Sequence, residues 1–153
     1  MCELHDYRPG DEDAVFRIVN HVLTEYGLST SPEVTDSDLR DIQKSYISTG
    51  GAFRVLKSGG GDIVGSYGLY AAPDGLCELR KMYLLRELRG KGLGKKMMDD
   101  AIQQAKAMGF TQMTLETNSC LWEALQLYRN FGFTEFVPDH LSDRCDIAMK
   151  RVL

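Results

Sequence analysis

The stretch from Arg89 to Lys96, with the sequence Arg-Gly-Lys-Gly-Leu-Gly-Lys-Lys, combines residue types that suit the binding of an anion. Glycine has no Cβ, so this backbone can approach a ligand closely, and the first amide N–H groups of a following helix have no partner within that helix. The dipole of the helix and the neighbouring lysines both favour negative charge at this position. The stretch therefore predicts an anion-binding loop.

The spacing of the glycines argues against two familiar nucleotide-binding loops. In a P-loop a second glycine follows the first by five residues, whereas Lys95 stands five residues after Gly90. The third glycine of the dinucleotide motif Gly-x-Gly-x-x-Gly is also missing. ATP and NAD are therefore disfavoured, although a nucleotide-binding domain that uses this loop remains an alternative.

A buried strand and an amphipathic helix must hold the loop between them. From Leu76 to Leu85 neither face of the expected strand is purely polar, which is typical of a central strand that is covered on both sides. From Leu93 to Met108 apolar residues recur at helical spacing, and Gly109 offers a left-handed stop.

A second, shorter helix is expected where Leu39, Ile42 and Tyr46 form one stripe after the capping-box pattern Thr35-x-x-Asp38. Nearby acidic residues could attract a cationic acceptor, but complementarity to the helix dipole is the simpler interpretation. These acidic residues are Asp36, Asp38 and Asp41.

The order of the remaining elements indicates the fold class. Three antiparallel strands followed by strand–helix–strand crossovers predict an α/β protein with three layers, α/β/α, around a mixed and mostly antiparallel sheet. We expect one domain over residues 1–153. The further elements are expected at 2–8 (strand), 11–26 (helix), 52–56 and 63–70 (a hairpin), 110–117 (strand), 121 to near 132 (helix), and 133–137 and 146–152 (strands).

Composition excludes several classes of protein and partner. The 153 residues are 43% hydrophobic and 26% charged, which is the balance of a soluble globular chain. The net charge of −4 disfavours nucleic acid as a partner, and no apolar run approaches the ~20 residues that span a bilayer. With no signal peptide at the start, we expect a cytoplasmic protein that does not act at a membrane.

The cysteines and histidines indicate neither disulfides nor a metal site. The four cysteines contain no Cys-x-x-Cys pair and are expected to be reduced thiols. The three histidines are scattered, and none combines with a cysteine or carboxylate at zinc-ligand spacing, so we predict no metal.

Two motifs in the correct order resemble the GNAT family of N-acetyltransferases. The first is Arg89-x-x-Gly92-x-Gly94, placed after the strand that contains Glu78-Leu79-Arg80-Lys81-Met82-Tyr83. The second is the run Ala-Leu-Gln-Leu-Tyr-Arg-Asn-Phe-Gly-Phe at 124–133. The resemblance implies the acyl-CoA N-acyltransferase fold, with acetyl-CoA as co-substrate and an amine as acceptor.

The resemblance also implies where acetyl-CoA binds. Backbone N–H groups of the loop would hold the pyrophosphate, and the strand before the loop would pair with the pantetheine arm and polarise the thioester carbonyl. The strand after the loop helix would be splayed from it, leaving a wedge for the arm. The implied residues are Met82, Tyr83, Leu84, Arg89, Gly90, Lys91, Gly92, Leu93, Gly94 and Lys95.

Acyl transfer needs a base, a donor for the oxyanion and an acid, because an amine with a pKa near ~10.4 is mostly protonated at neutral pH. Tyr128 matches the family tyrosine that approaches the CoA sulfur as an acid, or it packs only in the core. Glu78 is the favoured base, since burial could raise its pKa and it stands beside the residues expected to hold the thioester; a salt bridge to Arg80 or Lys81 is the alternative. Glu116 is the second candidate base, or a polar strand residue.

The identity of the acceptor stays open among a small amine, an amino acid, and a protein lysine or N-terminus. The first two helices and residues 24–36, including Tyr26, are expected to wall the acceptor side. A non-catalytic sensor or assembly module that binds acyl-CoA is the alternative to an enzyme. Members of the family often dimerise, so a homodimer is an open alternative to a monomer.

Overall fold

Seven strands form one sheet in the computed structural model, which describes residues 1–153. Their order across the sheet is β1-β2-β3-β4-β5-β7-β6, and only the β4–β5 pair is parallel. The predicted mixed, mostly antiparallel sheet is therefore confirmed. The strands are β1 (Glu3–Asp6), β2 (Ala52–Lys57), β3 (Ile63–Ala71), β4 (Leu76–Leu84), β5 (Gln112–Thr117), β6 (Thr134–Phe136) and β7 (Ile147–Val152).

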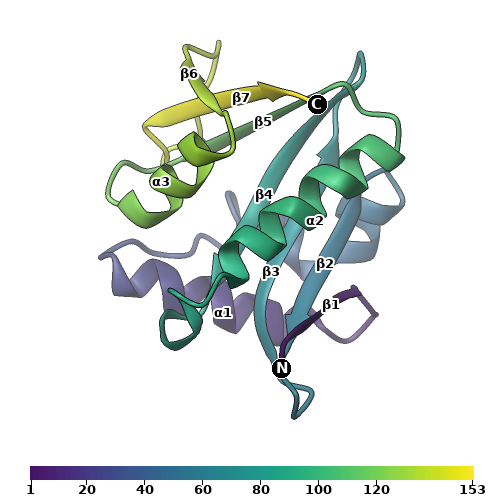
Figure 1. Ribbon diagram of the computed structural model, residues 1–153, viewed down its shortest axis with the longest axis vertical. Coiled ribbons are helices and arrows are strands. Elements are labelled where there is room, and N and C mark those ends of the chain that lie inside the picture. Colours follow the sequence, from purple (N-terminus) through teal and green to yellow (C-terminus); the bar gives the residue numbers. More distant parts are fainter.

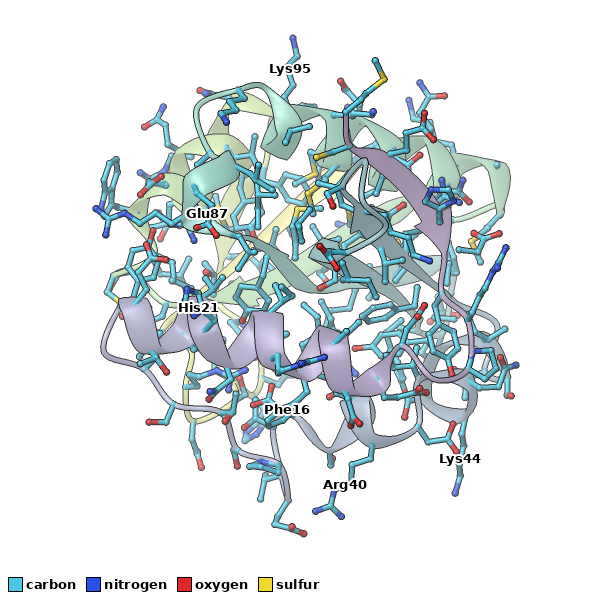
Figure 2. The ribbon with its side chains drawn as sticks, turned by 90° about the horizontal axis from the view of Figure 1, so that it is seen from below. Phe16, His21, Arg40, Lys44, Glu87 and Lys95 are labelled. Atoms are coloured by element: carbon cyan, nitrogen blue, oxygen red, sulfur yellow. The ribbon has the colours of Figure 1, made fainter.

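Helices cover both faces of the sheet (Figures 1 and 2). On one face, α2 (Leu93–Ala107) and α3 (Trp122–Asn130) bury apolar side chains with β3, β4 and β5 in the largest core cluster. On the other face, α1 (Glu12–Glu25) packs against β2 in a second cluster. The expected three layers are thus present, and no helix is both long and apolar enough to cross a bilayer.

The predicted continuous second helix is wrong. The chain forms a 3-10 turn, η1 (Ser37–Arg40), and then a five-residue π-type turn, η2 (Gln43–Ile47). Asp41 separates them in an extended conformation, and its carboxylate accepts the N–H of Lys44 at 3.0 Å, which begins the second turn anew. The apolar stripe of Leu39, Ile42 and Tyr46 is nevertheless buried as its spacing indicates.

The strands β4 and β5 are paired over only about half of their length and then diverge (Figure 1). Their register ends at Leu79 and Leu115, and beyond this point β5 pairs only with β7. The segment Arg80–Leu84 of β4 therefore has no partner strand on the β5 side. This is the splayed arrangement that the resemblance implies.

A β-bulge lies at the start of this unpaired segment. The register between β3 and β4 shifts between Ser66 and Gly68, so that Lys81 and Met82 together face Tyr67. Lys81 has a φ of 54°, which is uncommon for a residue with a side chain and reorients the peptide groups beside it. The sequence gives no local sign of this bulge.

Candidate active site

A cavity of about 590 Å³ occupies the gap between β4 and β5. This volume is in the range of small-molecule sites. The end of α1, the segment 28–38 and the segment 140–145 also contribute to its wall, as does Tyr26. The cavity brings together these predicted site residues: Glu78, Met82, Tyr83, Leu84, Arg89, Gly90, Gly92, Gly94, Lys95, Glu116 and Tyr128.

Three of the predicted residues direct their side chains away from the cavity. Leu93 packs against the small core cluster that contains Leu56 and Met97, and the side chain of Lys91 is exposed. Lys95 also projects away from the protein into solvent (Figure 2). What these three residues offer a ligand is therefore the main-chain N–H, since none of their N–H groups donates a hydrogen bond within the protein.

The loop before α2 presents a row of unused amide groups. Gly90 and Gly92 have φ values of 76° and 80°, conformations that glycine adopts without strain. None of the N–H groups from Gly90 to Lys95 donates a hydrogen bond, and the first donor in the helix is Lys96, to the carbonyl of Gly92 at 3.0 Å. The donors of this cradle suit the oxygen atoms of a diphosphate.

Arg89, which the resemblance includes among the residues that bind acetyl-CoA, already uses its guanidinium group within the protein. Its guanidinium forms two hydrogen bonds with Glu25, at 2.6 and 3.2 Å, and two with the carbonyl of Leu84, at 2.9 and 3.1 Å. The charge of Arg89 is therefore already paired. The side chain fastens the loop to the end of α1 and to the end of β4.

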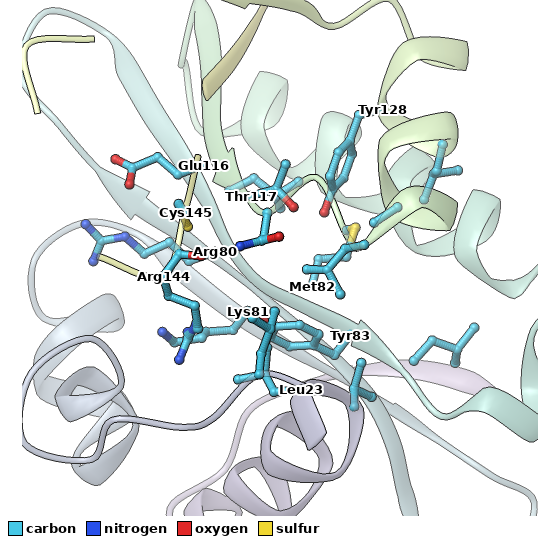
Figure 3. Close-up of a pocket in the computed structure, with 18 of the residues that line it drawn as sticks. Leu23, Arg80, Lys81, Met82, Tyr83, Glu116, Thr117, Tyr128, Arg144 and Cys145 are labelled. Carbon is cyan, nitrogen blue, oxygen red and sulfur yellow. Dashed lines mark hydrogen bonds between the residues drawn. The ribbon is translucent and has the colours of Figure 1, made fainter. Parts of the chain in front are cut away.

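Tyr128 directs its hydroxyl group into the cavity toward Met82 and Thr117 (Figure 3). Its ring is buried and packs edge-to-face against Phe133, with 6.0 Å between ring centroids. Burial, together with the nearby phenol of Tyr83, raises the pKa of the Tyr128 hydroxyl well above its ordinary value. The hydroxyl therefore stays protonated and can act as a hydrogen-bond and proton donor.

The two candidate bases differ in their contacts. Glu78 accepts a hydrogen bond from Nε of Arg80 through one carboxylate oxygen, and a quarter of its side chain is exposed. Glu116 accepts the N–H of Ser142 at 2.9 Å, which fixes the segment 140–145 to β5. Figure 3 shows Glu116 at the opposite end of the cavity from Tyr128.

A buried group of charges beside the cavity was missed from the sequence. Asp36 is fully buried and binds Lys81 at 2.8 Å and Arg144 at 2.6 and 2.9 Å. Burial alone would raise the pKa of Asp36, but the hydrogen bonds from Arg144 and the charge of Lys81 hold it well below its ordinary value. The interpretation of this residue as a complement to a helix dipole is therefore wrong.

Asp38 belongs to the same group rather than to a capping box. Its carboxylate accepts the hydroxyl of Tyr46 and lies 3.4 Å from the ammonium of Lys81. The sequence contains one indication of this buried cluster of charges, namely Lys81. A lysine in the middle of a strand that is covered on both faces needs a buried anion, although the sequence does not say which one.

Replacing Asp36 by asparagine is expected to lower the free energy of unfolding by about 3 kcal/mol, because buried Arg144 then loses its anion and Lys81 keeps only the carboxylate of Asp38, 3.4 Å away. Urea unfolding at neutral pH measures the change. The exposed acid Asp13, in the first turn of α1, gives a matched control, and Asp13→Asn should change stability by less than about 0.5 kcal/mol.

The effect of Asp36→Asn is also expected to depend on pH. The folded-state pKa of Asp36 is depressed, so its contribution to stability is complete above an unfolded pKa of about 3.9 and is lost as the pH falls through the folded pKa. The difference between wild type and variant should be constant from about pH 5 to 8 and narrow below about pH 4. Equal stabilities at pH 7 would show that the ion pairs contribute nothing.

The parallel strands β4 and β5 diverge, and unused main-chain N–H groups lie before α2, next to the gap between them. This arrangement is that of the acyl-CoA N-acyltransferase fold. The chain matches the family described as Acetyltransferase (GNAT) family over residues 17–133, and it belongs to this family. It is 39% identical to the uncharacterized N-acetyltransferase YjgM of Escherichia coli (strain K12), over 94% of this chain and 90% of that protein.

Solved structures share the same fold. An acetyltransferase of the GNAT family from Staphylococcus aureus Mu50 superposes with a TM-score of 0.93 at 22% identity and 99% coverage of both chains. A GNAT superfamily phosphinothricin acetyltransferase from Sinorhizobium meliloti, in complex with AcCoA, gives 0.76 at 22% identity, with 99% of this chain and 88% of that chain covered.

Proposed function

We propose that this protein transfers the acetyl group of acetyl-CoA directly to the primary amine of an acceptor. The observation that carries the proposal is the row of unused N–H groups from Gly90 to Lys95, which opens onto the same cavity as the unpaired edge of β4. The phosphinothricin acetyltransferase neighbour, solved with AcCoA, supports acetyl-CoA as the co-substrate.

Acetyl-CoA would lie along the wedge from the loop toward Tyr128. Its diphosphate would accept hydrogen bonds from the loop amides, and its pantetheine arm would pair with the main chain of Met82 and Tyr83 as an added strand. The carbonyl of Leu84 already accepts hydrogen bonds from Arg89, so it would not pair with the pantetheine arm. The bulge at Lys81 would leave a main-chain N–H near Met82 to polarise the thioester carbonyl.

The residues around the wedge supply the proton transfers of the reaction. Glu78 keeps one carboxylate oxygen free of Arg80 and would take a proton from the acceptor's ammonium group, directly or through a water. The amine nitrogen then bonds to the thioester carbon, and the C–S bond of the tetrahedral intermediate breaks. Tyr128 would give its proton to the departing thiolate. The nitrogen, which is still positively charged after the attack, would lose its second proton, and a proton returned through solvent would restore the Tyr128 hydroxyl, which leaves the amide and CoA.

Calorimetric titration with acetyl-CoA, with ATP as the control ligand, tests the binding part of this proposal. Release of CoA that depends on added amine, followed with a thiol reagent, tests the transfer. We expect micromolar binding of acetyl-CoA, none of ATP, and amine-dependent release. Binding without release for a broad panel of amines would indicate an acyl-CoA sensor, and tighter binding of ATP would indicate a nucleotide-binding domain.

Tyr128→Phe is expected to lower kcat by about 10- to 100-fold, because the variant removes one general acid and keeps the buried ring. Steady-state CoA release measures this loss, and the Kd for acetyl-CoA should stay within about threefold of wild type, since the hydroxyl faces the cavity and forms no hydrogen bond within the protein. An unchanged kcat would mean that Tyr128 has only a packing role.

A further inference from the structure

Arg80 carries a guanidinium group that is fixed in position but not saturated with anions. It lies over the ring of Tyr70, with 4.0 Å from Cζ to the ring centroid, and its Nε donates to Glu78. No carboxylate or carbonyl oxygen accepts a hydrogen bond from either of its two Nη atoms, although the hydroxyl of Tyr46 and the carboxylate of Asp38 lie close enough to interact with its charge. The side chain is one-third exposed and lines the cavity.

The other cations in this part of the cavity are already paired. Lys81 and Arg144 both bind the buried carboxylate of Asp36, and the side chain of each is at most 13% exposed. Arg80 is therefore the cation that offers the cavity a fixed pair of donors. The planar fork of an arginine matches the two oxygen atoms of a carboxylate.

Glu78, the partner of Arg80 in this ion pair, has one carboxylate oxygen that remains available to a ligand. One of its oxygen atoms accepts from Arg80, and the other binds no protein group. Glu78 and Arg80 therefore present a free anion acceptor beside a free cationic donor. A ligand that complements both has an ammonium group close to a carboxylate group.

We infer that the acceptor is an amino acid whose carboxylate binds the Nη atoms of Arg80 while its amine faces Glu78. This inference rests on the proposed function, and it selects one acceptor class among those that the sequence leaves open. The side chain of a protein lysine and the N-terminus of a protein carry no carboxylate beside their amine. A simple amine would leave the Nη atoms of Arg80 without an anion.

The test compares each of several amino acids with its own carboxamide, as acceptors in the CoA-release assay. The two members of a pair have nearly the same shape and differ in the negative charge. The amine of the amide is the less basic one, so the amide would be the better acceptor if the carboxylate were not bound. We expect kcat/KM for the preferred amino acid to exceed that of its amide by about 10- to 100-fold, as for hydrogen bonds to charged groups.

Arg80→Gln is expected to reduce this ratio to about one, mainly by raising KM for the amino acid. Whatever the substitution does to Glu78 acts on both members of a pair and cancels in the ratio. Arg80→Lys should keep part of the preference, because it retains the charge and loses the fork. Arg129→Gln, at an exposed position on α3 outside the cavity, is the matched control and should leave the ratio unchanged.

A wild-type ratio near one, or a ratio that Arg80→Gln and Arg80→Lys both leave intact, overturns the inference while acetyl transfer itself stands. Failure of the proposed function looks different, since no amine would then release CoA. If no amine releases CoA, calorimetric titration of CoA-saturated protein with each amino acid and with its carboxamide still tests whether Arg80 binds the carboxylate. Tighter binding of the amino acid that Arg80→Gln abolishes supports the subsite, and equal binding of acid and amide refutes it.

Discussion

Gly92→Glu is expected to weaken the binding of acetyl-CoA by at least about 100-fold, the equivalent of roughly two charge-assisted hydrogen bonds. The new carboxylate would stand at the N-cap of α2, beside the free amides that we assign to the diphosphate. The two groups would repel each other, and the carboxylate would compete for the same donors. Calorimetric titration of the purified variant measures the loss.

Gly109→Glu is the matched control at the other end of the same helix. Both glycines have positive φ values, 80° for Gly92 and 89° for Gly109, and a Cβ at either position would meet no atom within 4 Å. The backbone strain of the two variants should therefore be similar, at about 1 kcal/mol. Gly109→Glu should bind acetyl-CoA as wild type does, and equal binding by Gly92→Glu would mean that the loop does not hold the diphosphate.

Glu78→Gln is expected to lower kcat/KM at neutral pH by about 100- to 1,000-fold, the usual contribution of a general base. Glutamine can still accept the hydrogen bond from Arg80, so the fold and the Kd for acetyl-CoA should be preserved. The loss should shrink as the pH rises toward the pKa of the acceptor amine, because an amine that is already neutral needs no base. A pH series of CoA-release rates measures both effects.

Glu116→Gln is the comparison that separates the two candidate bases. Both glutamates line the cavity, but Glu116 holds the N–H of Ser142, and its loss should reduce kcat/KM by less than about tenfold. If Glu116→Gln instead shows the large, pH-dependent loss and Glu78→Gln does not, then Glu116 is the base.

The elements and the loop could be predicted because their signals are local. The apolar periodicity of α1 and α2 and the glycines that end turns specify structure within a few residues of themselves. The motif from Arg89 to Gly94 likewise positions its own amides. The order of the strands and helices therefore agrees with the structure, apart from the interrupted second helix and an unpredicted 3-10 turn, η3 (Arg86–Leu88), between β4 and α2.

The buried ion pairs could not be predicted, because they join residues that are distant in the sequence. Asp36 binds Lys81 and Arg144, which follow it by 45 and 108 residues, and Arg89 binds Glu25 from 64 residues away. A buried charge reveals that it needs a partner but not which partner. The bulge places Lys81 where its ammonium group takes part in the same tertiary pairing with Asp36.

The separation of β4 and β5 leaves a length of central strand without a neighbouring strand, and this segment forgoes the ladder hydrogen bonds that a full pairing would supply. An unpaired sheet edge of this kind is a template for other extended chains. Substitutions that drew the two strands together would make the protein more robust and leave no room for a ligand. A ligand that pairs with this edge would therefore stabilise the folded protein, and its melting temperature should rise with the concentration of that ligand.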